Sequence, residues 1–235
     1  MSTLAISEVN GVFELLKDRS IPEYAYQMRL AMPAIAETYS GAAEILALDY
    51  YDNQRSLAPA LGSAYAAKLG AYDFTDEIDS AVGYSVARLT KEAPQQKVLG
   101  MLAGSMQRAV ANADRSTVNF NVVTDPDGTA YERIPQSDAC AFCLTMAAVA
   151  GVQDDNYFNK YHDYCRCVTM PVFTGQSNTE LPIYGQTREA YDLAGSELQA
   201  ERRAVGYNDY RSADAAKKFP ELTLTTENHL RKMRQ

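Results

Sequence analysis

The chain has 235 residues, of which 46% are hydrophobic and 22% are charged, and its formal net charge is −8 at pH 7. These proportions are near the globular average and exclude wholesale disorder, and the negative charge argues against a chain devoted to nucleic acid. No apolar run approaches the roughly 20 residues of a membrane span, and the N-terminus lacks the basic start of a secretory signal. We therefore expect a soluble protein made in the cytoplasm, with one large domain or two small ones.

The first 115 residues are predicted to be helical. Ser20, Pro22 and Glu23 form a helix start, with a capping hydroxyl, an early proline and a glutamate three residues after the serine. The helix that follows should reach about Asn53. Pro33 lies inside it and should kink it or split it, because proline lacks an amide hydrogen for the helix ladder.

Three further helices are expected before residue 115, each marked by apolar residues at helical spacing. Pro59 suggests the start of the first of them, which would carry Leu61, Tyr65 and Leu69. Thr75 opens the second, whose apolar stripe consists of Ile78, Val82, Val86 and Leu89. Pro94 separates it from the third, whose stripe consists of Val98, Met101, Leu102, Met106, Ala109 and Val110.

The pattern changes at about Ser116. Residues 117–123 alternate polar and apolar side chains, which predicts a strand. The Asp-Pro-Asp-Gly sequence at 125–128 predicts a turn, because proline fixes φ and glycine accepts positive φ. Residues 129–134 could return as the second strand of a hairpin, and residues 167–173 are predicted to form another strand.

The predicted fold class is therefore α+β and mainly α. We expect a helical domain over residues 1–115, a small mixed α/β module with a Cys/His cluster over 116–175, and a linker, helix and basic tail over 176–235. The last helix should span 187 to about 204. Residues 201–235 hold eight Lys or Arg and five Asp or Glu, a net charge of +3 in an otherwise acidic chain.

All four cysteines and one of the two histidines lie within 28 residues of one another. The spacing is Cys140-x2-Cys143, eighteen residues, then His162-x2-Cys165-x-Cys167. A C-x2-C pair can hold one tetrahedral zinc ion together with a second pair of ligands from elsewhere in the chain. We predict a structural zinc site formed by four of these five residues, and no other cofactor.

Other interpretations of the cluster stay open. The cysteines could form disulfides, with three possible connectivities, or be small buried residues without any bond. Cys143 could also be a nucleophile at the start of a helix, where the helix dipole lowers the pKa of a thiol, with His162 as its base. The sequence shows neither an orienting group for that histidine nor an oxyanion hole.

The order of short motifs around this cluster is distinctive, and it consists of Arg133-Ile134-Pro135, Asp138-Ala139-Cys140-Ala141-Phe142-Cys143, Tyr161-His162-Asp163-Tyr164-Cys165-Arg166-Cys167 and Pro171-Val172-Phe173. This order resembles the MuF-like phage head morphogenesis family, in the version common in tailed phages of actinobacteria. The resemblance covers about residues 20–175.

The resemblance implies a minor capsid protein that acts beside the portal during head assembly and is located in the virion. Its partners would be the portal and major capsid proteins, and no membrane. The tail lies outside the resemblance, and its positive charge suggests packaged DNA as a further partner. The role would be structural rather than catalytic. Relatives are also labelled capsid maturation proteases, so proteolysis of the major capsid or scaffold protein by Cys143 and His162 is the alternative.

Overall fold

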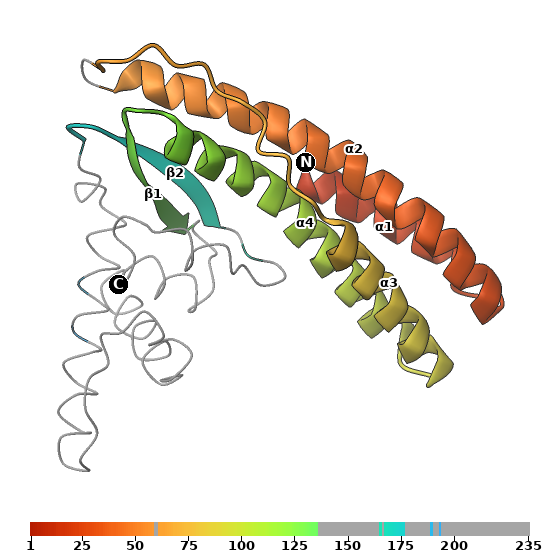
Figure 1. Ribbon diagram of the computed structural model, residues 1–235. Helices are drawn as coiled ribbons and strands as arrows, with labels where there is room; N and C mark the ends of the chain where they lie inside the picture. The colour runs from red at the N-terminus through yellow and green to blue at the C-terminus, as the bar shows by residue number, and fades with distance from the viewer. Residues whose placement is uncertain (59–60, 136–164, 166, 177–188, 190–192, 194–235) are drawn as a thin grey trace. The chain divides into compact units, whose positions relative to one another are not determined.

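The computed structural model describes residues 1–58, 61–135, 165, 167–176, 189 and 193 (Figure 1). Within these ranges it contains the helices α1 (Ser2–Leu16), α2 (Ile21–Leu57), α3 (Thr75–Thr90) and α4 (Gln95–Thr124), and the strands β1 (Gly128–Pro135) and β2 (Cys167–Phe173). This composition confirms the predicted α+β, mainly α, fold class. The chain divides into two compact units, which are described separately.

The first unit consists of Met1–Ser56 and Tyr65–Asn121. Its helices form two hairpins, one of α1 with α2 and one of α3 with α4 (Figure 1). The helix start predicted at residues 20–23 is confirmed, and the Glu23 amide donates a hydrogen bond to the Ser20 hydroxyl at 3.4 Å. Pro33 does not split α2, which runs through it without a break.

The core of the first unit follows from the apolar spacing of its helices. On α1, the buried residues Ala5, Val9 and Phe13 recur every four residues. The predicted stripes of α3 and α4 also face the core, and their fully buried members are Ile78, Val82, Val98, Leu102, Met106, Ala109 and Val110. Burying one such aliphatic side chain stabilises the fold by about 1.5–3 kcal/mol, so these stripes hold the bundle together.

The predicted strand at 117–123 is wrong, because α4 continues as a helix to Thr124. Thr117, Val118, Asn121 and Val122 are all buried, and their spacing of one, three and one residues is that of a helix face. Two members of this face, Thr117 and Asn121, are polar, so the order of polar and apolar residues resembles the alternation of a strand. Their hydrogen bonds explain why they are buried.

Residues 65–74 form an extended segment that runs along the helices, and we call it the strap (Figure 1). Asn121 is fully buried, and its side-chain amide hydrogen-bonds to the backbone of the strap as a neighbouring strand would. Its Oδ1 accepts hydrogen bonds from the Lys68 amide at 2.7 Å and the Tyr65 hydroxyl at 2.8 Å. Its Nδ2 donates to the carbonyl oxygens of Lys68 and Thr117, both at 2.7 Å.

The predicted helix with Leu61, Tyr65 and Leu69 is therefore also wrong, since the strap is extended. Its backbone amides bond to helix side chains instead of to one another. The Gly70 amide donates to the Thr117 hydroxyl at 3.2 Å, and the Tyr72 amide donates to Glu44 at 3.0 Å. A Cβ atom at Gly70 would lie 2.7 Å from the Thr117 backbone, so glycine is needed for this close approach.

The second unit contains Leu57–Ala64 and the described residues from Val122 onward. The predicted turn at 125–128 is confirmed, with the Gly128 amide donating to the Asp125 carbonyl at 3.0 Å. Asp127 stabilises the turn through two hydrogen bonds. Its carboxylate accepts one from the Ser63 amide at 2.8 Å, and its carbonyl oxygen accepts one from the Thr174 amide at 2.9 Å. A methyl group at Gly128 would collide with the Val122 carbonyl oxygen, so only glycine fits here.

The strands β1 and β2 pair in antiparallel orientation as a two-stranded sheet. The two strands predicted at 129–134 and 167–173 are thus confirmed, but β1 pairs with β2 instead of with the residues before the turn. The pairing runs from Gly128 opposite Phe173 to Pro135 opposite Cys167. Tyr131, Glu132 and Arg133 are consecutive and all buried, so both faces of β1 are covered.

The helix predicted over 187–204 lies largely outside the described residues. Glu189 and Leu193 are the two described positions within it, and both are helical.

Candidate functional site

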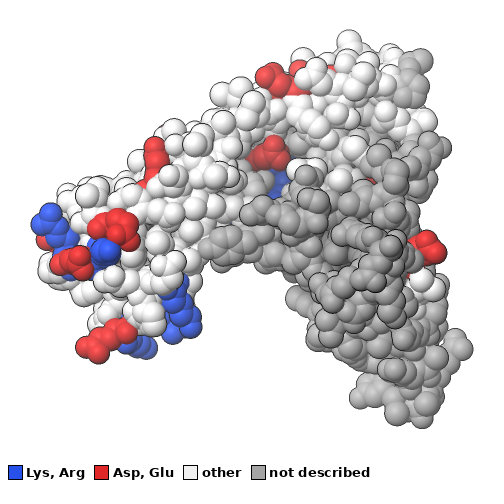
Figure 2. Space-filling model, turned by 180° about the vertical axis from the view of Figure 1, so that it is seen from behind, with Lys and Arg blue, Asp and Glu red and all other residues white. Residues whose placement is uncertain are grey.

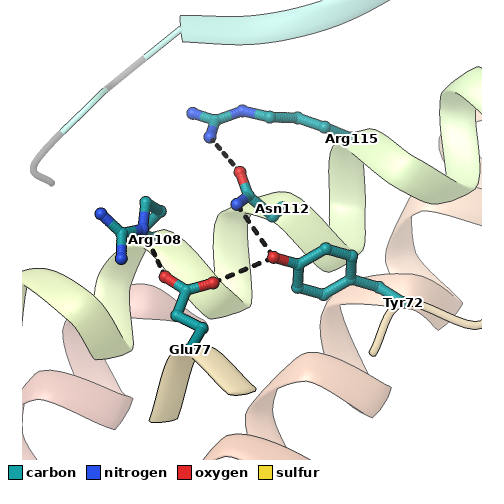
Figure 3. Close-up of polar contacts among 5 residues, drawn as sticks. All are labelled: Tyr72, Glu77, Arg108, Asn112 and Arg115. Atoms are coloured by element: carbon teal, nitrogen blue, oxygen red, sulfur yellow. Dashed lines mark hydrogen bonds and ion pairs between the residues drawn. The ribbon is translucent and has the colours of Figure 1, made fainter. Parts of the chain in front are cut away.

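A network of polar side chains joins the strap, α3 and α4 in the first unit (Figure 3). The Tyr72 hydroxyl donates to Glu77 Oε2 at 2.9 Å, and Arg108 Nε donates to Glu77 Oε1 in an ion pair. The Asn112 amide donates to the Tyr72 oxygen at 3.2 Å, and Arg115 Nη1 donates to Asn112 Oδ1 at 3.1 Å.

Glu77 is the centre of this network and links the strap to α4. Both oxygens of Glu77 accept hydrogen bonds, from Arg108 and from Tyr72. Burial, together with the Glu77 carboxylate, raises the pKa of Tyr72, and the hydrogen bond from Asn112 opposes this. The phenol therefore stays protonated at neutral pH and continues to donate to Glu77. The network was not predicted, because its partners follow no sequence pattern. Arg108 is 31 residues from Glu77, and Asn112 is 40 residues from Tyr72.

A groove of about 640 Å³ opens beside this network, between α3 and α4. From α3 it is lined by Asp76, Glu77, Ser80, Ala81 and Tyr84, which share one helix face. From α4 it is lined by Met101, Ser105 and Arg108. Its size is within the range of known ligand pockets, about 300–1,000 Å³. It combines an ion pair, hydroxyl groups and apolar walls.

The residues of the predicted Cys/His cluster are only partly placed. Cys165 and Cys167 are buried, at the entry of β2 and in its first position. Residues two apart in a strand share a face. The other three candidates, Cys140, Cys143 and His162, lie outside the described residues, so the zinc and nucleophile hypotheses stay predictions. Across the described ranges, no three His, Cys, Asp or Glu side chains come together in a way that could hold a metal ion.

The sheet register nevertheless brings two of the recognised motifs together. Arg133-Ile134-Pro135 lies at the end of β1, and Cys167 lies at the start of β2. Pro135 is opposite Cys167, and Ile134 is opposite Val168. The chain therefore leaves and re-enters the sheet at neighbouring positions, on either side of Cys140, Cys143 and His162 in the sequence.

A second electrostatic feature lies between α2 and α4. Burial raises the pKa of Asp114, whereas Arg115 and the amino terminus of Met1 lower it to a smaller extent. Burial, followed by the charge of Asp114, also raises the pKa of Tyr50 to about 12. Asp114 is therefore a carboxylate whose charged form the fold disfavours.

We expect Asp114→Asn to raise the melting temperature at pH 7. A carboxyl with a raised folded-state pKa destabilises the fold fully above that pKa, and this penalty disappears as pH falls below the unfolded-state value of about 3.9. The gain in melting temperature should accordingly shrink from pH 7 to pH 4. Asp49→Asn, at an exposed position on α2, is the matched control and should change stability little. An equal gain in both variants would contradict the assignment.

No helix in the described part of the chain combines the length and apolarity needed to cross a membrane.

The fold and the site define a mainly helical α+β protein with a strapped helical unit and a cysteine-bearing strand pair. The family model described as VG15 protein matches residues 1–194, most of the chain. The chain belongs to this family, which is a family of phage proteins. No curated protein and no solved structure matches it.

Proposed function

We propose that this phage protein is a minor capsid protein of the MuF-like kind, which acts in head assembly beside the portal and has a structural role. The single observation that carries the proposal is the pairing of β1 with β2. It places Pro135 of the Arg-x-Pro motif opposite Cys167 of the Cys-x-Cys motif, 32 residues away in the sequence, and the Pro-Val-Phe motif lies further along the same strand pair. Membership of a phage protein family is consistent with this role.

The surface of the helical unit supports a role in assembly. Figure 2 shows basic and acidic side chains gathered at the end of this unit that carries the hairpin turns. The surface next to this end has few charged side chains. On α1 and α2, Leu4, Tyr26, Leu30 and Ile45 are each more than half exposed. Exposed apolar groups of this kind are suited to contacts with other subunits, which we propose are the portal and major capsid proteins.

We further propose that four of Cys140, Cys143, His162, Cys165 and Cys167 bind one structural zinc ion. The burial of Cys165 and Cys167, and the position of Cys167 opposite the end of β1, support this, because a zinc ion there would fasten both ends of the intervening segment. When bound, the ion would supply a tetrahedral cross-link with no open position for chemistry. The basic tail is proposed to contact packaged DNA.

The test of the head-protein role is a phage that lacks this gene and is complemented with variants of it. Purified heads are assayed by mass spectrometry for this chain and for the intact mass of the major capsid protein. We expect the chain in heads at low copy number, and the same capsid-protein mass with wild type, Cys143→Ala and His162→Ala. His229→Ala is the control for loss of a histidine.

Two outcomes would overturn the structural role. The chain could be absent from purified procapsids and virions, in which case it is not a head component. Alternatively, the capsid or scaffold protein could be shortened with wild type and His229→Ala but left intact with Cys143→Ala or His162→Ala. That result would make the chain the maturation protease.

A further inference from the structure

We propose that the outward face of α2 binds the same face of a second copy of the chain, with the two helices antiparallel. This rests on the proposed function in one respect, namely that exposed apolar residues of the helical unit meet other subunits. It names one of those subunits: a second copy covers α2, and Leu4 and Leu15 of α1 remain exposed for the portal and capsid proteins.

The outward face of α2 carries an apolar stripe that the fold leaves in solvent. At 3.6 residues per turn, its members project from the helix within an arc of about 100°. They are Tyr26, Leu30, Ala34, Gly41 and Ile45. The buried residues of α2 project to the other side, into the core, whereas Leu30 is 56% and Ile45 is 57% exposed. An apolar surface of this kind marks a contact with another protein.

Gly41, in the middle of the stripe, lowers the stability of the single chain. A glycine inside a helix is about 1 kcal/mol less favourable than alanine. A Cβ atom at Gly41 would meet nothing within 4 Å in the described structure, so one chain alone has room for a side chain there. A second helix packed on Gly41 explains the glycine, because the distance between two helix axes depends on the size of the side chains at their contact.

The stripe matches its own reverse, as an interface with two-fold symmetry requires. In an antiparallel pair centred between residues 37 and 38, Leu30 lies opposite Ile45, and Ala34 lies opposite Gly41. The direction midway between positions 37 and 38 falls within the stripe, so the two copies present it to each other. Large apolar side chains therefore meet at both ends, and small residues meet at the centre, where the helices approach.

The polar groups at the ends of the stripe are complementary in the same register. Tyr26 lies opposite the second copy's Asp49, so its phenol can donate a hydrogen bond to that carboxylate. Both groups are exposed, and neither forms a hydrogen bond or ion pair with a residue that the structure describes. The stripe ends at Asp49, because the next turn of α2 holds the strap, whose Ala67 amide donates to Asp52 at 3.2 Å.

The size of the stripe implies a weak dimer. From Tyr26 to Asp49 it is about 35 Å long at 1.5 Å per residue. Two helices packed over that length bury on the order of 1,000 Å² in total, at the low end of specific interfaces. The exposed Glu37 carboxylates of the two copies lie near the midpoint and repel each other, which weakens the pair further. We expect a dissociation constant of about 10 μM.

The experiment measures the monomer–dimer equilibrium of the full chain by sedimentation velocity, in reducing buffer that prevents disulfides between chains. Tyr26→Glu should weaken the dimer about tenfold, because it places a carboxylate opposite Asp49. Adding Asp49→Lys to that variant should restore the dimer. The two positions are about 35 Å apart on one helix, so the rescue requires a second copy. Asp79→Lys, at an exposed position of α3, makes the same change of charge and should not restore it.

Gly41→Ala separates dimer formation from the stability of the single chain. At about 1 μM, where the chain is mostly monomeric, it should raise the melting temperature, because alanine favours a helix. It should nevertheless weaken the dimer about tenfold, because the added methyl group lies at the closest contact of the two helices. Gly83→Ala is the matched control, at a glycine of α3 with equal room, and should raise the melting temperature without changing the dimer.

The proposal is overturned if the wild-type chain is a monomer at twenty times the expected dissociation constant. It is also overturned if Asp79→Lys restores the dimer as well as Asp49→Lys does, which would show a general effect of charge. Equal effects of Gly41→Ala and Gly83→Ala on the dimer would likewise contradict it. The presence of the chain in purified heads is measured separately, so the dimer and the head role can each fail without the other.

Discussion

Replacing Asn121 with alanine is expected to lower the free energy of unfolding by about 3–5 kcal/mol. The change removes four hydrogen bonds at 2.7–2.8 Å, each worth about 1 kcal/mol, and leaves the amide and carbonyl of Lys68 without partners. Because the total stability of a domain is about 5–15 kcal/mol, this is a large share of it. The midpoint of urea unfolding gives the change, and the exchange rate of the Lys68 amide shows whether the strap is released.

Asn53→Ala is the control, because it makes the same replacement at an exposed position of a helix. It should change stability by less than about 0.5 kcal/mol. Asn121→Asp is a second variant that keeps the size of the side chain but cannot donate to the Lys68 and Thr117 carbonyls, so it should destabilise as well. If Asn121→Ala costs no more than Asn53→Ala, Asn121 does not secure the strap.

Removal of zinc is expected to have the second large effect. If four of the five cluster residues bind the ion, the reduced protein should contain one zinc per chain by elemental analysis. Chelation should then lower the melting temperature markedly, because the binding free energy of a structural zinc ion adds to the stability of the folded state. Backbone amides of β1 and β2 should exchange faster once the ion is gone.

Each of Cys140, Cys143, His162, Cys165 and Cys167 should be replaced by alanine in turn, with His229→Ala as the control. Four of the five variants should lose zinc and should then be equally stable with and without chelator, whereas His229→Ala should behave as wild type. Comparing each variant with and without chelator separates loss of the metal from loss of packing at the buried Cys165 and Cys167. Absence of zinc from the reduced wild type would leave disulfides or plain packing as the role of these cysteines.

Local patterns were sufficient to predict much of the fold. The spacing of Ile78 with Val82, and of Val98 with Leu102 and Met106, identified α3 and α4, since burial of one helix face needs only residues three or four apart. The limits of β2 and the turn before β1 were also predicted, because β-branched runs and Asp-Pro-Asp-Gly act over a few residues.

The two errors share one cause, which is bonding between distant polar side chains and backbone. The end of α4 was predicted as a strand because polar residues, among them Thr117 and Asn121, alternate with apolar ones there. Both are buried because they bond to the strap. The helix carrying Leu61, Tyr65 and Leu69 was predicted from their spacing after Pro59. The partners that keep the strap extended, among them Glu44, are far away in the sequence and leave no local pattern. A glycine at position 62, inside the expected helix, was the local sign against that prediction.

The candidate site could be predicted only in part, for the same reason. The cysteines of the cluster were identified by their spacing, and Cys167 lies opposite Pro135 of another recognised motif. The groove depends on α3 and α4 packing at a particular distance, with small residues facing each other. No sequence pattern encodes the pairing of Glu77 with Arg108 across two helices.

Because Pro135 and Cys167 lie opposite each other in the sheet, residues can be inserted between them in the sequence without moving either strand. The sheet fixes both ends of the connection, so an insertion that makes no contacts of its own adds only loop-closure entropy. Doubling the number of residues between two fixed ends costs about 0.6 kcal/mol, less than one net hydrogen bond. Residues added between Cys143 and His162 should therefore be tolerated, because they change neither the paired strands nor the five residues of the cluster.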